Sequence, residues 1–347
     1  LNIADRLRAM ARELPFHRAL VCPAGHDRTG RAVYTQLTFR ELDQESDRLA
    51  RGLVQFGVRP GTRLVLMVRP GLDFLALTFA LFKARAVVVL IDPGMGTRSV
   101  FRCLEQVEPQ GFIAVPVVQA VRLANRFRFK AARFNVTVGR RWFWTGPTYR
   151  DLLGGAWTPF DTTGTRPTDP AAIIFTSGGT GPAKGVVYEH GMFDAQAEML
   201  REFYQIQPGE IGLSGFLLFA TFNATLGVTT VIPDKGISRP AMLNPWRVVE
   251  AIRTQGVTQA FASRAVWDRV GRQAGVDSRD FECLKQVFSA GAPVPLDVIA
   301  RLTQILPADG DIHTPYGATE SLPICSIAGR EILATTADRC ASALRCR

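Results

Sequence analysis

A glycine-rich segment, "TSGGTGPAKG", directly follows the apolar run "AAIIF" and occupies residues 176–185. Glycine tolerates the positive φ angles of a loop that points several backbone N–H groups to one side. Such consecutive N–H groups form a concave anion site, to which hydroxyl groups and a lysine would add hydrogen bonds and charge. The segment therefore predicts a site for the phosphates of ATP or for pyrophosphate. Its candidate residues are Thr176, Ser177, Gly178, Gly179, Thr180, Gly181 and Lys184.

This segment differs from a Walker A loop. Ala183 stands before the lysine and Gly185 after it, where that motif has a glycine and a hydroxyl residue. A flexible surface loop is the alternative interpretation, and the order of residues over the whole segment argues against it.

A second constellation lies nearer the C-terminal end, in "SAGAPV" (289–294) and "PYGATES" (315–321). The small residues Gly291, Ala292 and Pro293 would allow a planar base to lie on the backbone. Tyr316 offers an aromatic face or, alternatively, a core side chain. Glu320 offers a carboxylate of the kind that binds Mg²⁺ together with water and phosphate oxygens. The motif Y-G-x-T-E alone is weak evidence for a nucleotide site. Its occurrence after the glycine-rich segment strengthens the interpretation of both motifs.

The elements that must position these motifs alternate along the chain. Short apolar runs are typical of buried strands, and amphipathic or wholly apolar stretches between them are typical of helices. Strands at 63–68, 86–92 and 112–115 alternate with helices at 72–84 and 97–107. This order predicts an α/β fold with parallel sheets that helices cover on both faces. The candidate motifs would then follow strands, at the edge where such sheets bind ligands.

A second series of the same kind follows the glycine-rich segment. We expect strands at 211–219, 227–233, 258–263 and 284–294, a strand running into a loop at 311–321, and helices between them. The Pro-, Gly- and Thr-rich stretch 158–170 is the best internal boundary. The sequence thus predicts a first subdomain over 1–165, a second that carries the ATP motifs over 166–333, and a poorly ordered tail over 334–347.

Composition limits the class of protein. The 347 residues are 47% hydrophobic and carry a net charge of +10, which favours anionic ligands. The six cysteines form no C-x-x-C pair, so we expect neither a zinc ribbon nor a redox pair, and a reducing cytoplasm suits them. No apolar run reaches the roughly 20 residues of a membrane span, and the charged N-terminal segment does not resemble a signal peptide.

The stretch 119–150 is both basic and aromatic. One interpretation is a docking or membrane-surface patch. The other, which the sequence favours, is a solvated helix face followed by a strand. The sequence shows no basic stripe with interleaved aromatics of the kind that binds single strands, so no nucleic-acid partner is expected.

The motifs resemble those of the adenylate-forming superfamily, which includes acyl-CoA synthetases, peptide-synthetase adenylation domains and luciferases. The superfamily loop is [YF]-T-S-G-[ST]-T-G-x-P-K-G, and residues 175–185 match it except at Gly179 and Ala183. "AGAP" (290–293) is similar to the adenine-binding turn, and residues 316–320 match Y-G-x-T-E. Arg85 stands where the superfamily usually has glycine, and Arg264 where it usually has proline.

This resemblance implies the large N-terminal domain of such enzymes, two stacked βα subdomains. The small C-terminal lid domain, with its catalytic lysine, has no counterpart here, so the sequence resembles a truncated form. It also implies residue roles. The phosphates would be held by the loop residues already named. Adenine would be bound by Gly291, Ala292, Pro293, Tyr316 and Gly317, the α-phosphate by Thr319 and Mg²⁺ by Glu320, with Lys184, Thr319 and Glu320 catalytic.

Within the superfamily, "DPGMG" (92–96), "KGVVYEHGMF" (184–193) and "TPYGATESLPICSIAGREI" (314–332) are similar to the olefin β-lactone synthetase and fatty acyl-CoA ligase families. This similarity implies adenylation of a long-chain fatty-type acid, then ring closure of a 2-alkyl-3-hydroxy acid to a β-lactone with release of AMP. It also implies assembly with thiolase-like, reductase and decarboxylase enzymes. The alternatives are a long-chain fatty acid–CoA ligase and a non-catalytic nucleotide-binding remnant.

The segment 217–227, "LLFATFNATLG", falls where the superfamily lines its acyl pocket. The resemblance assigns Phe219, Phe222, Asn223 and Gly317 to substrate binding. Ordinary core packing predicts the two phenylalanines equally well.

Overall fold

The computed structural model describes residues 1–175, 184–215, 217–233, 244–273 and 275–336. The chain divides into two compact units. Unit 1 comprises Leu1–His17 and Leu37–Glu202, and unit 2 comprises Arg18–Gln36 and Phe203–Arg347. Both units therefore contain separate stretches of chain, whereas the division expected from the sequence is continuous, with its boundary after residue 165.

Unit 1 is built on a six-stranded sheet in the order β6-β5-β3-β4-β7-β8. Neighbouring strands run parallel except for the last pair, β7 and β8, which is antiparallel. Residues 170–175 pair with β4 in this sheet, so the chain stays within unit 1 on both sides of the stretch 158–170. The strands are β3 (Arg63–Met67), β4 (Val87–Ile91), β5 (Gly111–Ala114), β6 (Phe134–Thr137), β7 (Pro170–Phe175) and β8 (Gly185–Glu189).

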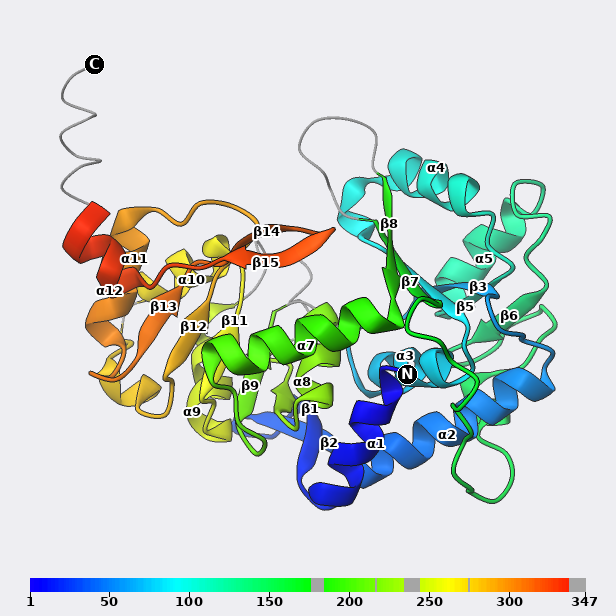
Figure 1. Cartoon of the computed structure of the whole chain (residues 1–347), viewed down its shortest axis with the longest axis horizontal. Coiled ribbons are helices and arrows are strands. Elements are labelled where there is room, and N and C mark those ends of the chain that lie inside the picture. The colour runs from blue at the N-terminus through cyan, green and yellow to red at the C-terminus, as the bar shows by residue number, and fades with distance from the viewer. Residues whose placement is uncertain (176–183, 216, 234–243, 274, 337–347) are drawn as a thin grey trace. The chain divides into compact units, whose positions relative to one another are not determined.

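Helices cover both faces of this sheet, as the sequence predicts. Figure 1 shows α4 and α5 on one face and α2 and α3 on the other. Cys103, Leu104 and Val107 of α4 pack on Val65 and Phe112 of the sheet. The helices are α1 (Ala4–Glu13), α2 (Phe39–Gln55), α3 (Leu72–Lys83), α4 (Thr97–Val107), α5 (Pro116–Ala124), α6 (Tyr149–Leu152) and, crossing into unit 2, α7 (His190–Tyr204); η1 (Pro93–Met95) is a short 3₁₀ turn.

One departure from the superfamily pattern, Arg85, lies in the turn between α3 and β4. Arg85 has a φ of 57°, a left-handed conformation that glycine adopts without strain. The arginine side chain also lies 3.5 Å from a carboxylate oxygen of Asp169. The backbone therefore retains the geometry that favours glycine, although the residue itself is not glycine.

Unit 2 is built on a seven-stranded sheet in the order β13-β12-β11-β9-β10-β1-β2. The pairs from β13 to β1 are all parallel. The sequence did not lead us to expect β1 and β2, which come from the N-terminal part of the chain. The strands are β1 (Arg18–His26), β2 (Ala32–Thr38), β9 (Ile211–Ser214), β10 (Thr229–Val231), β11 (Gln259–Phe261), β12 (Gln286–Phe288) and β13 (Asp311–His313).

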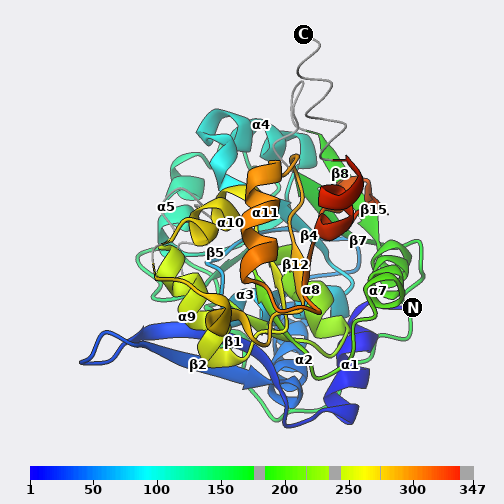
Figure 2. The ribbon, with the colours of Figure 1, turned by 90° about the vertical axis from the view of Figure 1, so that its left-hand side faces the viewer.

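The helices of unit 2 lie on both faces of its sheet. Figure 2 shows α9, α10 and α11 on one side of the strands and α8 on the other. Contacts of α9 with β9, α11 with β13 and α8 with β10 agree with this arrangement. The helices are α8 (Leu217–Thr225), α9 (Pro245–Gln255), α10 (Arg264–Gly271), α11 (Leu296–Ile305) and α12 (Gly329–Glu331), with short turns η3 (Ser278–Phe281) and η4 (Ile332–Thr336).

The structure corrects two element assignments in this unit. The predicted strand at 211–219 ends at Ser214, and its remainder opens α8, because an apolar run this short fits a helix and a strand equally well. The predicted loop after β13 is instead an antiparallel hairpin of β14 (Tyr316–Ala318) and β15 (Ser321–Cys325). Most of the tail predicted to be poorly ordered, residues 337–347, lies outside the described residues.

The described residues also bear on the expectations about membrane spans and cysteines. None of their helices combines the length and the apolar composition that a bilayer crossing requires. Their four cysteines, Cys22, Cys103, Cys283 and Cys325, are free thiols, the first two of them buried.

Candidate functional site

The glycine-rich segment connects two antiparallel strands of unit 1. Its residues Thr176, Ser177, Gly178, Gly179, Thr180 and Gly181 lie outside the described part of the chain. Phe175 at the end of β7 is in register with Gly185 at the start of β8. A Cβ on Gly185 would lie 2.7 Å from the Phe175 ring, so only glycine fits this close approach. Lys184 is exposed immediately before this glycine, at the rim of the connection.

The predicted adenine turn follows β12 in unit 2. Gly291, Ala292 and Pro293 are all exposed. Gly291 has a φ of 87°, and a Cβ there would meet no atom within 4 Å, so the backbone face is open to a ligand. A guanidinium nitrogen of Arg264 donates a hydrogen bond of 3.4 Å to the Pro293 carbonyl. The arginine that replaces the usual proline thus contacts the turn itself.

The Y-G-x-T-E motif forms the β14–β15 hairpin. Tyr316 is 67% exposed, which removes the alternative that it is a core residue. Gly317 is required by close packing, because a Cβ there would lie 2.6 Å from the Ser321 carbonyl oxygen. Thr319 and Glu320 lie between the two strands, and the carboxylate-bearing residue is exposed. The hairpin therefore presents an aromatic ring and a carboxylate at the surface of unit 2.

The structure brings these two motifs together within unit 2. They follow β12 and β13, which are neighbouring parallel strands paired through Phe288 and His313. The Ser289 N–H donates to the His313 carbonyl at 3.1 Å, just before the adenine turn. Both motifs thus leave the carboxyl edge of one sheet, where open α/β sheets bind ligands. Lys184 belongs to unit 1 and Glu320 to unit 2, and their joint action on a triphosphate stays a prediction.

An aromatic cluster beneath this edge was not predicted. The rings of Tyr204, Phe288 and His313 lie with centroids 4.7–5.5 Å apart. Burial lowers the pKa of His313 below its ordinary value, so the imidazole is neutral at physiological pH. The Ser289 hydroxyl is buried and has no hydrogen-bond partner within the described chain. In the sequence, only the serine of "SAGAPV" indicates a polar group at this position.

The predicted acyl-binding residues lie on α8. Phe222 is buried, whereas Phe219 and Asn223 are partly exposed. The Phe219 ring stacks on Phe261 of β11 with centroids 3.8 Å apart. A Cβ on Gly212 of β9 would lie 2.7 Å from the Asn223 amide nitrogen. These contacts fix α8 tightly on its sheet, so packing accounts for Phe222, and Phe219 and Asn223 keep some accessible surface.

The described residues include no group of three or more His, Cys, Asp or Glu side chains that could enclose a metal ion. Glu320 by itself suits Mg²⁺, which usually keeps several water ligands and takes only one or two protein carboxylates alongside phosphate oxygens. The exposed Glu320 therefore fits a magnesium ion that arrives with a nucleotide.

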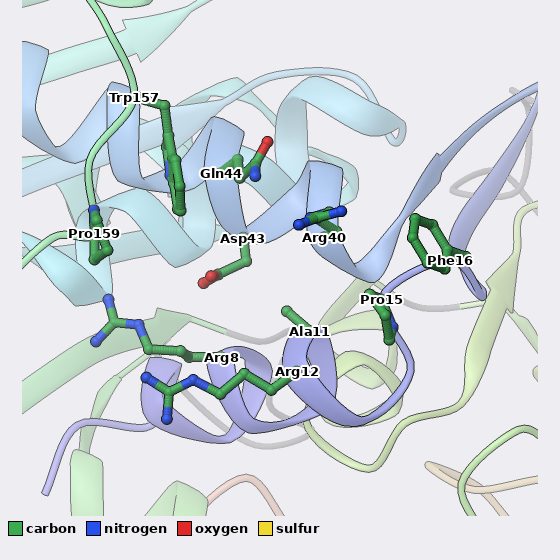
Figure 3. Close-up of a pocket in the computed structure, with 10 residues that line it drawn as sticks. All are labelled: Arg8, Ala11, Arg12, Pro15, Phe16, Arg40, Asp43, Gln44, Trp157 and Pro159. Atoms are coloured by element: carbon green, nitrogen blue, oxygen red, sulfur yellow. The ribbon is translucent and has the colours of Figure 1, made fainter.

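Unit 1 contains a cavity of about 430 Å³ that holds none of the predicted site residues. Figure 3 shows it between α1, α2 and the segment around Trp157. Asp43, which lines it, also belongs to a buried ion cluster, in which the Lys83 ammonium is 2.6 Å from Asp43 and 2.7 Å from Asp47. The Trp157 indole N–H also donates to Asp47, at 3.1 Å. The charges of the cluster pair with one another, which indicates a structural role.

His190 is likewise part of the packing of unit 1. Its Nδ1 accepts a hydrogen bond of 3.2 Å from the Ile3 N–H, and its ring meets Phe82 edge-on. The side chain is fully buried, and burial lowers its pKa to about 4. It therefore stays neutral at physiological pH.

Comparison with known proteins places the chain in a family. Residues 7–346 match the family described as AMP-binding enzyme. The chain belongs to this family. The chain is 45% identical, over 96% of its length, to the olefin beta-lactone synthetase of Xanthomonas campestris, and 44% identical, over 99%, to that of Stenotrophomonas maltophilia. It spans 60% and 62% of the length of these two relatives.

Solved structures support the fold of the AMP-binding enzyme. A long-chain-fatty-acid-CoA ligase of Archaeoglobus fulgidus aligns with a TM-score of 0.79 at 17% identity, covering 97% of this chain and 68% of the ligase. A fatty acyl CoA synthetase of Mycobacterium tuberculosis aligns with a TM-score of 0.73 at 20% identity, covering 92% and 60%. The chain therefore has the α/β fold of the large domain that the sequence resemblance implied.

Proposed function

We propose that this AMP-binding enzyme adenylates a long-chain fatty-type carboxylic acid with ATP and Mg²⁺, giving acyl-AMP and pyrophosphate. We further propose that the substrate is a 2-alkyl-3-hydroxy acid, which then closes to a β-lactone as AMP leaves. The observation that carries the proposal is the 45% identity to an olefin beta-lactone synthetase over almost the whole chain. The adjacent adenine turn and Y-G-x-T-E hairpin of unit 2 support it.

Each proposed site residue has a physical role in the first step. Tyr316 would stack on the adenine, and the open backbone at Gly291 would receive its edge. Thr319 and Lys184 would hold phosphate oxygens as charge develops on them, an electrostatic effect that supplies much of the rate. Bound Mg²⁺ would neutralise phosphate charge, and Glu320 would be its protein ligand.

The second step would need little from the protein beyond positioning. The 3-hydroxyl and the activated carboxyl belong to one molecule, so proximity replaces an external nucleophile. The partly exposed residues of α8, Phe219 and Asn223, together with Gly317, would orient the acyl chain. A cytoplasmic location and the thiolase-like, reductase and decarboxylase partners implied by the resemblance belong to the same proposal.

The test is an assay of this chain with ATP, magnesium and a synthetic 2-alkyl-3-hydroxy acid, with and without coenzyme A. We expect AMP, pyrophosphate and β-lactone in equal amounts without coenzyme A, measured by mass spectrometry. A thioester as the main product would identify a CoA ligase instead. Binding of ATP with no pyrophosphate exchange would identify a non-catalytic nucleotide-binding protein.

The variant Lys184→Ala should lower the rate of pyrophosphate exchange roughly 100-fold, because it removes a charge from the developing transition state. The matched control is Lys285→Ala, since that lysine is also exposed and belongs to unit 2. We expect the control to exchange pyrophosphate like the unmodified chain. Equal rates in both variants would contradict the role of Lys184.

A further inference from the structure

One long stretch of unit 1 carries positive charge without any negative charge. Between Glu108 and Asp151 the sequence has no aspartate or glutamate. The same stretch contains eight cationic residues, namely Arg122, Arg126, Arg128, Lys130, Arg133, Arg140, Arg141 and Arg150. An uninterrupted run of one sign is a strong electrostatic feature at the surface of a protein.

The fold gathers this stretch along one edge of a sheet. It forms α5, the turns that follow it, the edge strand β6 and the segment after that strand (Figure 1). The Gln119 amide fastens α5 to the sheet by donating to the Phe112 and Val136 carbonyls. A Cβ on Gly139 would lie 3.8 Å from the Pro116 ring, so the segment after β6 returns to the start of α5.

Large apolar side chains are exposed along the same edge. Val117 and Val121 are one helical turn apart on α5, and exposed aromatic residues follow in the turns after α5 and in the segment after β6. Trp142 and Phe143 contact Trp144, which is itself anchored by a hydrogen bond from its indole to Thr137. The exposed fractions are 63% for Val117, 46% for Val121, 62% for Phe127, 51% for Trp142 and 77% for Phe143.

Most of these eight cations have no carboxylate partner among the described residues. Arg126, Lys130, Arg133 and Arg140 make no ion pair with any residue that the structure describes. By contrast, Arg128 is 2.6 Å from Glu105, and Arg141 donates to the Gly146 carbonyl. The unpaired charges are therefore available to an external anion.

These observations select one kind of partner. Exposed tryptophan and phenylalanine side chains beside arginine and lysine suit the boundary between lipid headgroups and acyl chains. Nucleic acid also attracts cations and aromatic rings, but it gives the aliphatic Val117 and Val121 nothing to bury against. We propose that this edge, residues 116–143, docks unit 1 on a membrane surface that contains anionic phospholipid. The proposal is independent of the adenylation chemistry.

Vesicle flotation of the whole chain tests this docking. We expect binding to vesicles of equal parts phosphatidylcholine and phosphatidylglycerol at low salt, and little binding to phosphatidylcholine alone. Binding should weaken at about 0.5 M salt, because screening shortens the reach of the charges. Failure to float with the anionic vesicles at low salt would overturn the proposal.

Charge-reversal variants distinguish docking through this edge from attraction by the overall positive charge of the chain. Arg126→Glu with Lys130→Glu should weaken vesicle binding at least about tenfold, given the contribution of each cation near an anionic surface. Arg28→Glu with Arg59→Glu changes the net charge equally at exposed positions elsewhere and should bind nearly as the unmodified chain does. Equal losses in the two double variants would contradict a specific docking edge.

The aromatic residues need a separate comparison. Phe143→Ala should weaken vesicle binding several-fold, while Phe203→Ala, at an equally apolar exposed residue of unit 2, should not. Melting temperatures of all variants should match that of the unmodified chain. If a fluorescent single-stranded oligonucleotide binds through the same residues and the vesicles do not, the edge is a nucleic-acid surface and the lipid proposal is wrong.

Discussion

The exposure and the aromatic side chain of Tyr316 together indicate a role in binding a ligand. The residue is two-thirds exposed at the start of β14, so it contributes little to the core. It follows a strand adjacent to the one that leads to Gly291, whose backbone is open. An exposed aromatic ring and an open backbone at the same edge of one sheet suit the binding of a planar base.

We predict that Tyr316→Ala raises the Kd of the chain for ATP about tenfold or more, because base stacking on an aromatic ring contributes about 1–3 kcal/mol. The Phe variant keeps the ring and should bind almost normally. Titration calorimetry measures both, and the thermal stability of the Ala variant should not change. Normal ATP binding by the Ala variant would exclude stacking on this residue.

His190 predicts a pH dependence of stability. Burial lowers its pKa to about 4 in the folded chain, whereas an exposed histidine has a pKa of about 6.5. Between these values the unfolded chain binds a proton that the folded chain does not. The free energy of unfolding should therefore fall as pH falls from about 6.5 to about 4, by about 3 kcal/mol in total from this residue.

Urea unfolding at several pH values tests the His190 contribution. His190→Gln should flatten the dependence across this pH range, although it also lowers the overall stability. His17→Gln is the control, since His17 is exposed. A slope that is unchanged in the His190 variant would assign the pH dependence to other groups.

At the scale of elements, α3 depends on a single buried charge. All of its residues from Phe74 to Lys83 are buried, and in this buried part only Thr78 and the C-terminal lysine are polar. The Lys83 ammonium donates to the carboxylates of Asp43 and Asp47 and, at 2.9 Å, to the Asp43 carbonyl. The cluster thereby ties α3 to α2.

We predict that Lys83→Met lowers the free energy of unfolding by about 3–5 kcal/mol, because it leaves two buried carboxylates without their main cation. Urea unfolding measures the loss. Lys285→Met, at an exposed lysine, should cost almost nothing. A small loss in Lys83→Met would mean that Arg8, 3.3 Å from Asp47, can compensate for the missing cation.

At the scale of the whole molecule, the chain passes between its two units more than once. Residues 18–36 leave unit 1 after α1 and supply β1 and β2 to the sheet of unit 2. The chain returns to unit 1 at Leu37, and Phe203 begins the remainder of unit 2. The units therefore cannot be separated by a single cut in the sequence.

The sequence alone determined the features that depend on neighbours along the chain. Apolar periodicity located α3, α4, β3 and β4 to within a residue or two, and short motifs indicated the family and the predicted nucleotide-binding residues. Helical period, strand alternation and loop glycines are local properties, so a window of residues contains their physical cause.

Tertiary structure decided everything that depends on distant partners. Pairing of β1 with β10 and of β12 with β13 joins segments that no local pattern connects. The apolar residues from Leu217 onward, which fit a strand or a helix equally well, form a helix that contacts β9 and β10. The edge of unit 1 that collects exposed aromatics and unpaired cations also emerged only when α5 and β6 were placed side by side, because surface exposure is a property of the folded chain.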